Sequence, residues 1–187
     1  MPKVSFGIRI RYDSKCAESA TRLEQLGFDF LGTGEHVMRG DSPIPDPLAL
    51  PVLAVAAGAT KKIRLASVVT LVPLYNPVIL AKEVTTLDHA SGGRLTLGVG
   101  IGGEFPIEFD VCGVPYKQRG KRTNESLELM KRLWAEEKLA FQGQFYQYEK
   151  VTLLPQPLQK PHPPIWIAGR KEAAMRRAAK YGDGWFP

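Results

Sequence analysis

Apolar and polar residues follow one another along the chain in a pattern that predicts strands separated by helices. Short apolar stretches typical of strands lie at 4–8, 28–33, 63–69, 95–99, 165–168 and 184–186. Apolar residues recur at helical spacing between them, at 14–27, 47–59, 76–93, 123–134 and 172–181. This repeat predicts a parallel sheet, because parallel neighbouring strands need a crossover helix between them.

Two of the predicted helices carry capping residues at their ends. Ser14 is the expected N-cap of the first helix, which ends at Gly27. Asn76 is the expected N-cap of the helix at 76–93, with Pro77 in its first turn, and Gly92-Gly93 ends it.

The repeat is interrupted between 140 and 164. The stretch 141–146 predicts a small hairpin that turns near Gly143. Residues 154–164 contain five prolines, which exclude regular structure there. We therefore expect a hairpin, then an extended segment, then the strand at 165–168.

Two architectures fit a parallel sheet with this element order: an open doubly wound sheet and a (β/α)₈ barrel. Both place their chemistry at the carboxyl ends of the strands. The residues that directly follow each predicted strand are therefore the candidates for a functional site.

Composition is that of an ordinary globular domain. The 187 residues are 44% hydrophobic and 24% charged, which suits a single domain with a buried core. We expect neither a membrane span nor a secretory signal, because no apolar stretch has the required length. Cys16 and Cys112 match no metal-site spacing, so we expect free thiols in a reducing, cytoplasmic setting and no metal.

The net charge of +6 leaves two interpretations open. Basic residues gather at 61–62, 117–122 and 170–177, either on solvated helix faces or around an anionic cofactor or substrate. No aromatic interleaving or known nucleic-acid module accompanies them, so we do not expect nucleic acid as a partner.

A glycine motif follows the strand at 95–99. Gly98, Gly100 and Gly103 have the spacing G-x-G-x-x-G, but no helix follows directly and no second strand ends in an acid. A dinucleotide site is therefore not expected. The glycines would instead let the backbone approach a flat or phosphorylated ligand, or form a tight turn.

Polar residues follow two other strands. Gly34-Glu35-His36 comes after the second strand, where an imidazole beside a carboxylate can act as an acid, a base or a structural pair. Ser67 and Thr70 end the third strand, where hydroxyls can bind a ligand or cap the strand. Motifs of serine hydrolases, zinc peptidases and P-loop proteins are missing, and His89 and His162 are expected to be structural.

Together these strand ends resemble the bacterial luciferase-like flavin-dependent oxidoreductases. The resemblance covers essentially the whole chain. It is carried by Gly34-Glu35-His36, ASVVTLVPLYNP at 66–77, SGGRLTLGVG at 91–100, and PIWIAG at 164–169 followed by GDGW at 182–185.

The resemblance implies a single α/β domain of the (β/α)₈ TIM-barrel type over 1–187, with about six βα units and an insertion at about 140–164. It implies the deazaflavin coenzyme F-420 as cofactor, with FMN as the alternative, and a non-prolyl cis peptide at Ser67-Val68. The cofactor-binding residues would be Ser67, Val68, Thr70, Gly100, Ile101, Gly102, Ala168, Gly169 and Arg170. His36 would exchange a proton with a small-molecule substrate, Glu35 would orient the imidazole, and Glu104 would be a second candidate acid.

Family members extend further, so the resemblance implies a C-terminally incomplete barrel. An open barrel exposes strand edges, which favours completion in a homodimer or higher homo-oligomer. The expected function is hydride transfer between the cofactor and a small organic substrate, as an oxidoreductase or monooxygenase. The alternatives are a non-catalytic flavin-binding protein and an inactive fragment completed by oligomerisation.

Overall fold

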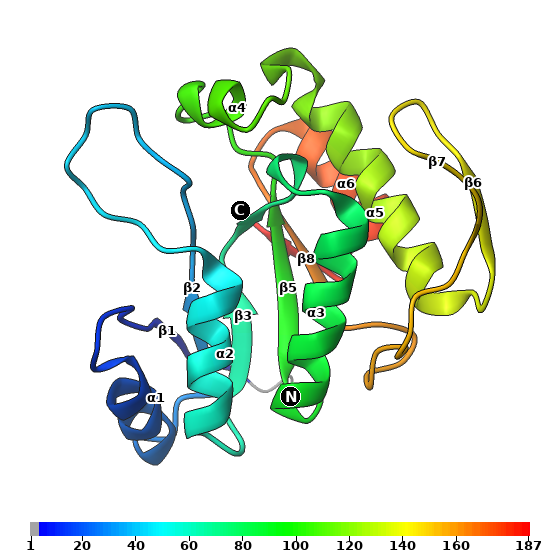
Figure 1. Ribbon diagram of the computed structural model, residues 1–187. Helices are drawn as coiled ribbons and strands as arrows, with labels where there is room; N and C mark the ends of the chain where they lie inside the picture. The colour runs from blue at the N-terminus through cyan, green and yellow to red at the C-terminus, as the bar shows by residue number, and fades with distance from the viewer. Residues whose placement is uncertain (1–3) are drawn as a thin grey trace.

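Parallel strands form one curved sheet in the computed structural model, which describes residues 4–187 (Figure 1). The strand order is β1-β2-β3-β5-β8-β9, and the short β4 pairs with β5; every one of these pairings is parallel. The strands are β1 (Gly7–Arg9), β2 (Phe30–Thr33), β3 (Arg64–Ser67), β4 (Thr70–Leu71), β5 (Leu95–Gly100), β8 (Ile165–Ala168) and β9 (Gly184–Phe186).

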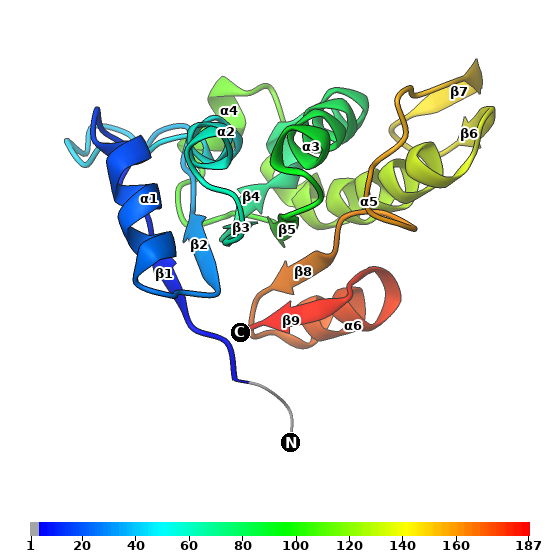
Figure 2. The ribbon, with the colours of Figure 1, turned by 90° about the horizontal axis from the view of Figure 1, so that it is seen from below.

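Helices cover the convex side of this sheet. In Figure 2 the strands lie in an arc around a central space and the helices surround them on the outside, which makes a curled half-barrel of the predicted (β/α)₈ type. The helices are α1 (Cys16–Gln25), α2 (Ala49–Ala59), α3 (Pro77–Ser91), α4 (Ile107–Val111), α5 (Arg119–Ala135) and α6 (Glu172–Tyr181), with 3-10 turns η1 (Val72–Leu74) and η2 (Tyr116–Gln118).

The hydrophobic core lies between the sheet and these helices. Large aliphatic side chains at alternate strand positions are at most 1% exposed, namely Leu31, Leu65, Leu95, Leu97, Val99, Ile165 and Ile167. Side chains alternate between the two faces of a strand, so the residues between them face the concave side. Burial of the outer set holds the strands against the helices.

Helix capping follows the sequence at α3 and differs at α1. The Asn76 side chain accepts hydrogen bonds from the N–H groups of Val78 and Ile79, and Gly92 ends α3 in the left-handed conformation. The prediction for Ser14 is wrong: α1 begins at Cys16, and Lys15 is the N-cap without a side-chain bond. The Asp13 carbonyl oxygen already accepts from the Cys16 N–H in a turn there.

The predicted strand at 63–69 ends early. β3 pairs with β2 up to Ser67, and the Val68 N–H still donates to the Thr33 carbonyl, so the ladder continues through the Ser67-Val68 bond. The expected cis peptide is therefore misplaced by one residue, because it lies between Val68 and Val69. The chain then pairs again as β4.

A two-stranded hairpin and an irregular segment separate α5 from β8. β6 (Leu139–Gln142) and β7 (Gln147–Val151) pair antiparallel around Gly143, as predicted. The Glu125 carboxylate of α5 accepts three backbone N–H bonds from residues 144–146 at the turn. Residues 152–164 contain no helix or strand. The hairpin and this segment correspond to the predicted insertion, whose status as such stays a prediction.

None of the helices in residues 4–187 has the length and apolar character needed to cross a membrane. Both cysteines are free: Cys16 is buried and Cys112 is half-buried.

Candidate active site

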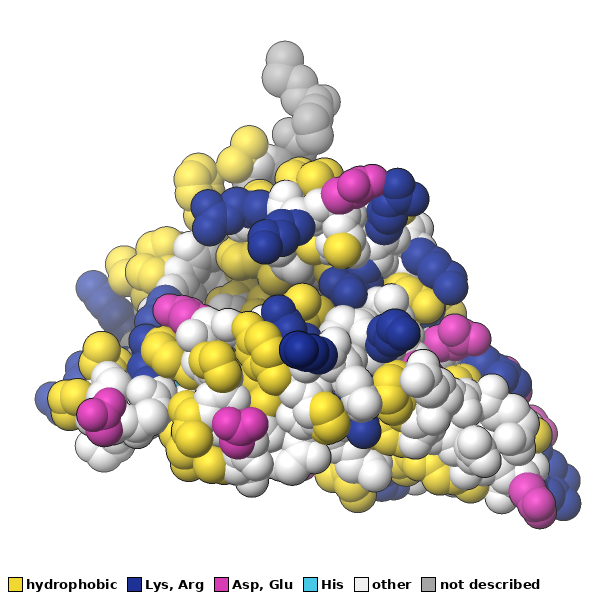
Figure 3. Space-filling view, turned by 90° about the horizontal axis from the view of Figure 1, so that it is seen from above, with side chains coloured by type: hydrophobic (Ala, Val, Ile, Leu, Met, Phe, Trp, Pro, Cys, Tyr) yellow, Lys and Arg dark blue, Asp and Glu magenta, His cyan; other side chains and the backbone are white. Residues whose placement is uncertain are grey.

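The concave side of the sheet holds a cavity of about 1180 Å³. Its walls include both edge strands, through residues such as Arg9 of β1 and Phe186 of β9. Figure 3 views the carboxyl ends of the strands, where apolar side chains surround a hollow and Lys and Arg side chains lie around it. The cavity therefore opens where parallel sheets place their functional sites.

Most of the predicted site residues line this cavity. They are His36, Glu35, Glu104, Val68, Gly100, Ile101, Gly102, Ala168, Gly169 and Arg170. Ser67 and Thr70 do not line it, and both are fully buried.

Ser67 is directed at the neighbouring strand. Its hydroxyl donates to the Gly98 carbonyl and accepts from the Gly98 N–H, each at 2.9 Å, which occupies it with β5. The Thr70 hydroxyl has no hydrogen-bond partner within the described residues. The prediction that these hydroxyls bind cofactor therefore has no support in the cavity geometry.

Glu35 links three segments near the carboxyl end of β2. One oxygen accepts from the Leu71 N–H at 2.7 Å, and the other accepts from the Ala49 N–H at 3.0 Å and the Tyr75 hydroxyl at 3.1 Å. Burial raises the pKa of Glu35, although these three bonds favour the ionised form. Burial and the nearby Glu35 also raise the pKa of Tyr75. Glu35 thus anchors the start of α2 and β4 against β2.

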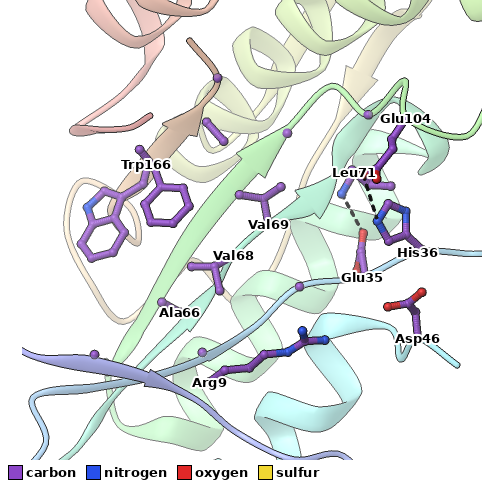
Figure 4. A pocket seen from close by; sticks show the side chains of 18 of the residues that line it. Arg9, Glu35, His36, Asp46, Ala66, Val68, Val69, Leu71, Glu104 and Trp166 are labelled. Carbon is purple, nitrogen blue, oxygen red and sulfur yellow. Dashed lines mark hydrogen bonds and ion pairs between the residues drawn. The ribbon is translucent and has the colours of Figure 1, made fainter. Parts of the chain in front are cut away.

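His36 lies between two other carboxylates. Its Nδ1 is 3.0 Å from Oε1 of Glu108, and its Nε2 is 3.9 Å from Oε2 of Glu104 (Figure 4). The Glu108 side chain is fully buried, whereas the Glu104 side chain is 69% exposed. The ring of Phe105 packs edge-on against the imidazole, with centroids 5.0 Å apart.

The predicted role of Glu35 as the orienting group is therefore wrong, because Glu108 holds the imidazole. Sequence reasoning missed Glu108 because it considered only residues directly after strands. The short helix α4 returns this side chain to the end of β2, across 72 positions in sequence. The available signal was a lone acid between Ile107 and Phe109, since an acid in an apolar setting is usually paired.

An ion pair closes the rim of the cavity beside His36. Arg39 binds Asp46 with two hydrogen bonds, and its guanidinium stacks 5.0 Å above the centre of the Phe105 ring. The Arg39 bond holds the pKa of Asp46 below its ordinary value. These contacts join the loop after β2 to the loop after β5.

The opposite side of the cavity is aromatic and backbone-rich. Trp166 lies across the cavity from His36, with Val68 and Val69 between them (Figure 4). The rings of Trp166 and Phe30 are 5.2 Å apart. At the end of β8, Gly169 is held by β9, because its N–H donates to the Phe186 carbonyl and its carbonyl accepts from Trp185 Nε1. Arg170 follows, just before α6 begins.

The other two histidines lie outside the cavity. His89 and His162 each bond to a backbone carbonyl, as expected of structural histidines. The glycine motif ends β5 and leads to the five-residue α4, so it does not open a dinucleotide-binding helix. Within residues 4–187, no group of three or more His, Cys, Asp or Glu is placed to hold a metal ion.

The cavity has the chemistry of a site for a flat ligand with an anionic end. Small residues such as Gly32, Ala66 and Gly100 leave a shallow wall, and Trp166 and Phe30 add aromatic surface. Gly169 and the cationic Arg170, which follow β8, lie on one side, where a positive charge favours an anion. The imidazole of His36, a group that is able to take up or release a proton, lies on the other side.

Comparisons with known proteins show which family this chain belongs to. The family model described as luciferase-like monooxygenase matches residues 14–187. The FMNH₂-dependent dimethylsulfone monooxygenase of Pseudomonas putida is 29% identical over 180 residues, which are 95% of this chain and 48% of that protein. The chain spans about half the length of the curated relatives it matches.

Two solved structures share the fold over nearly all of the chain. Monooxygenase RslO1 from Streptomyces bottropensis matches with a TM-score of 0.80 and 33% identity, over 97% of this chain and 59% of that one. An F-420-dependent secondary alcohol dehydrogenase, bound to an F-420–acetone adduct, matches with a TM-score of 0.85 and 26% identity, over 98% of this chain and 58% of that one.

Proposed function

Because the chain belongs to the luciferase-like monooxygenase family, we propose that it binds a deazaflavin (F-420) or FMN in the concave cavity. There it transfers hydride between that cofactor and a small organic substrate. The observation that carries this proposal is the position of His36 across the cavity from Trp166, at the carboxyl ends of the strands. Relatives that use FMNH₂ and F-420 support both cofactors.

The residues of the cavity fit such a cofactor. Val68, Gly100 and Ile101 offer a mostly apolar wall for a ring system, and Gly169 and Arg170 suit its phosphate side. When bound, the cofactor supplies or accepts the hydride, and the protein supplies position and charge.

His36 handles the proton that accompanies the hydride. In the oxidation of an alcohol, Nε2 of His36 would accept the hydroxyl proton, while a bound cofactor would accept the hydride from the carbon, which would leave a carbonyl. In the reverse direction the same nitrogen donates the proton. The exposed Glu104 lies 3.9 Å from this nitrogen and can pass the proton on to solvent.

Assembly as a homodimer or higher homo-oligomer is part of the proposal. The wholly apolar α2 supports it, because Val55 of α2 and Ile79 of α3 are about half exposed. Location in the cytoplasm stays a prediction.

The test combines cofactor binding with turnover. The 187-residue chain is titrated with F-420 and with FMN by cofactor fluorescence, and hydride transfer is followed with simple alcohols and ketones. We expect saturable, micromolar binding of one cofactor. His36→Ala should retain this affinity within about twofold and lose turnover by about 10²- to 10⁴-fold.

His89→Ala is the matched control, because His89 lies outside the cavity, and it should retain both properties. If neither cofactor binds, the proposal fails. If His36→Ala abolishes binding as well as turnover, His36 is a cofactor contact and its role as the proton-exchanging group is wrong.

A further inference from the structure

The two nitrogens of the His36 ring face different surroundings. Glu108, next to Nδ1, is fully buried and does not line the cavity. Glu104, on the Nε2 side, is exposed and lines the cavity together with His36. The Nδ1 side therefore faces the protein interior, and the Nε2 side faces the ligand space.

The carboxylate of Glu108 is fixed by a second contact. While Oε1 meets Nδ1 of His36 at 3.0 Å, Oε2 accepts the backbone N–H of Val37 at 2.8 Å. An ionised carboxylate has only acceptor atoms, so this arrangement calls for two donors, the Val37 N–H and a proton on Nδ1. A ring without that proton would set a lone pair against a buried carboxylate oxygen, which is costly.

We propose that Glu108 is a positioning residue that keeps the proton of His36 on Nδ1 and so leaves Nε2 as the acceptor for the substrate proton. The part of this inference that concerns the substrate proton rests on the proposed function. When Nε2 takes the hydroxyl proton of an alcohol, the ring becomes a cation, and Glu108 stabilises that cation. The logic is that of the buried acid in catalytic triads.

Replacement of Glu108 by glutamine should change the tautomer of His36. The Val37 N–H and Nδ1 contact different oxygens of Glu108, Oε2 and Oε1. An amide has one acceptor oxygen and one donor nitrogen in these two places, so it cannot accept from both donors there. If its oxygen stays on the fixed Val37 N–H, its NH₂ group must donate to Nδ1. The ring proton then moves to Nε2, and the ring faces the ligand with the wrong tautomer.

Nitrogen NMR of the histidine rings tests the tautomer without any cofactor. Long-range ¹H–¹⁵N spectra are recorded at alkaline pH, where imidazoles are neutral, and His36 is assigned by the signals lost in His36→Asn. We expect Nδ1 to be protonated in the unmodified chain and Nε2 in Glu108→Gln. Asp110→Asn, an exposed acid-to-amide change in the same helix, should match the unmodified chain.

A proton on Nε2 in the unmodified chain overturns the proposal, and so does an unchanged tautomer in Glu108→Gln. The first of these does not need Glu108→Gln, so the test holds even if that variant fails to fold.

Turnover separates this inference from the proposed function. Glu108→Gln should lower kcat by about 10- to 100-fold while the cofactor Kd stays within about twofold. If the tautomers are as expected but the unmodified chain turns over nothing, the proposed function fails and the positioning by Glu108 stands. If the chain is active but the tautomer is wrong, only the inference about Glu108 fails.

Discussion

The two faces of the sheet share the same strands but are built from different residues. On the outer face, Leu65, Leu97 and Ile167 are at most 1% exposed and pack beneath helices. On the inner face, Gly32, Ala66 and their neighbours line the cavity. Aliphatic burial on the outer face stabilises the backbone, and small residues on the inner face leave room for a ligand.

The comparison shows how one strand can serve both purposes. In β5, Leu97 points outward into the core, whereas Gly98 next to it lies on the inner side. A side chain could be tolerated at Gly98 only if the neighbouring β3 moved. The inner face therefore depends on small residues as strictly as the outer face depends on large ones.

Substitution of Gly98 by alanine should have the largest effect. A Cβ atom there would lie 2.0 Å from the carbonyl oxygen of Ser67, which is backbone and cannot rotate away. We expect Gly98→Ala to lower the free energy of unfolding by at least about 3 kcal/mol, measured by urea unfolding.

Gly58 of α2 offers the matched control, because a Cβ there meets nothing within 4 Å. Gly58→Ala should raise the free energy of unfolding by about 0.5–1 kcal/mol. Equal stability of Gly98→Ala and the unmodified chain would show that the inner face tolerates bulk, and the contrast between the faces would lose its basis.

Substitution of Trp166 should affect binding more than folding. Trp166 is half-buried, lines the cavity and contacts Phe30. We expect Trp166→Ala to raise the Kd of the bound cofactor about tenfold, because the ring loses an aromatic contact. Tyr148→Ala removes a half-buried aromatic residue outside the cavity and should leave the Kd unchanged in the same fluorescence titration. Equal Kd values for the two variants would argue against a ligand beside Trp166.

The bounds of the strands and helices that bury the outer face are easier to predict from the sequence than the side-chain contacts of the site. The strands at 165–168 and 184–186 and the helix at 172–181 have the predicted bounds, because each is a short apolar or periodic segment between clear breaks. The periodicity of apolar residues indicates which side chains are buried against helices, and this pattern can be read within each segment alone.

The inner face depends on contacts between distant segments. The sequence predicts that Ser67 binds the cofactor, yet its hydroxyl bonds to the backbone of Gly98 on the neighbouring strand. The partner of His36 lies 72 residues away in a helix too short to show periodicity. Glu35, the acid next to His36 in sequence, instead accepts hydrogen bonds from backbone N–H groups of other segments. The sequence predicts the strand ends that form the site. The pairing of side chains within the site becomes visible only in the folded structure.

The ion pair at the rim of the inner face gives the smallest expected effect, and one that depends on pH. The bond from Arg39 lowers the pKa of Asp46 from its ordinary value of 3.8, and the Asp46 side chain is 7% exposed. A carboxyl group with a lowered pKa in the folded state contributes stability above its unfolded pKa. That contribution is lost as the pH falls through the folded pKa.

Asp46→Asn should therefore lower the free energy of unfolding by about 1 kcal/mol near neutral pH. The difference between the two proteins should shrink below pH 3.8 and vanish once the pH is below the lowered pKa of Asp46 in the folded state. Urea unfolding across this range measures the difference. Asp41→Asn, an exposed change on the same loop, should have an effect below about 0.5 kcal/mol at every pH. A difference for Asp46→Asn that persisted in acid would mean that the loop depends on the shape of this side chain, because a protonated Asp46 no longer carries the charge that pairs with Arg39.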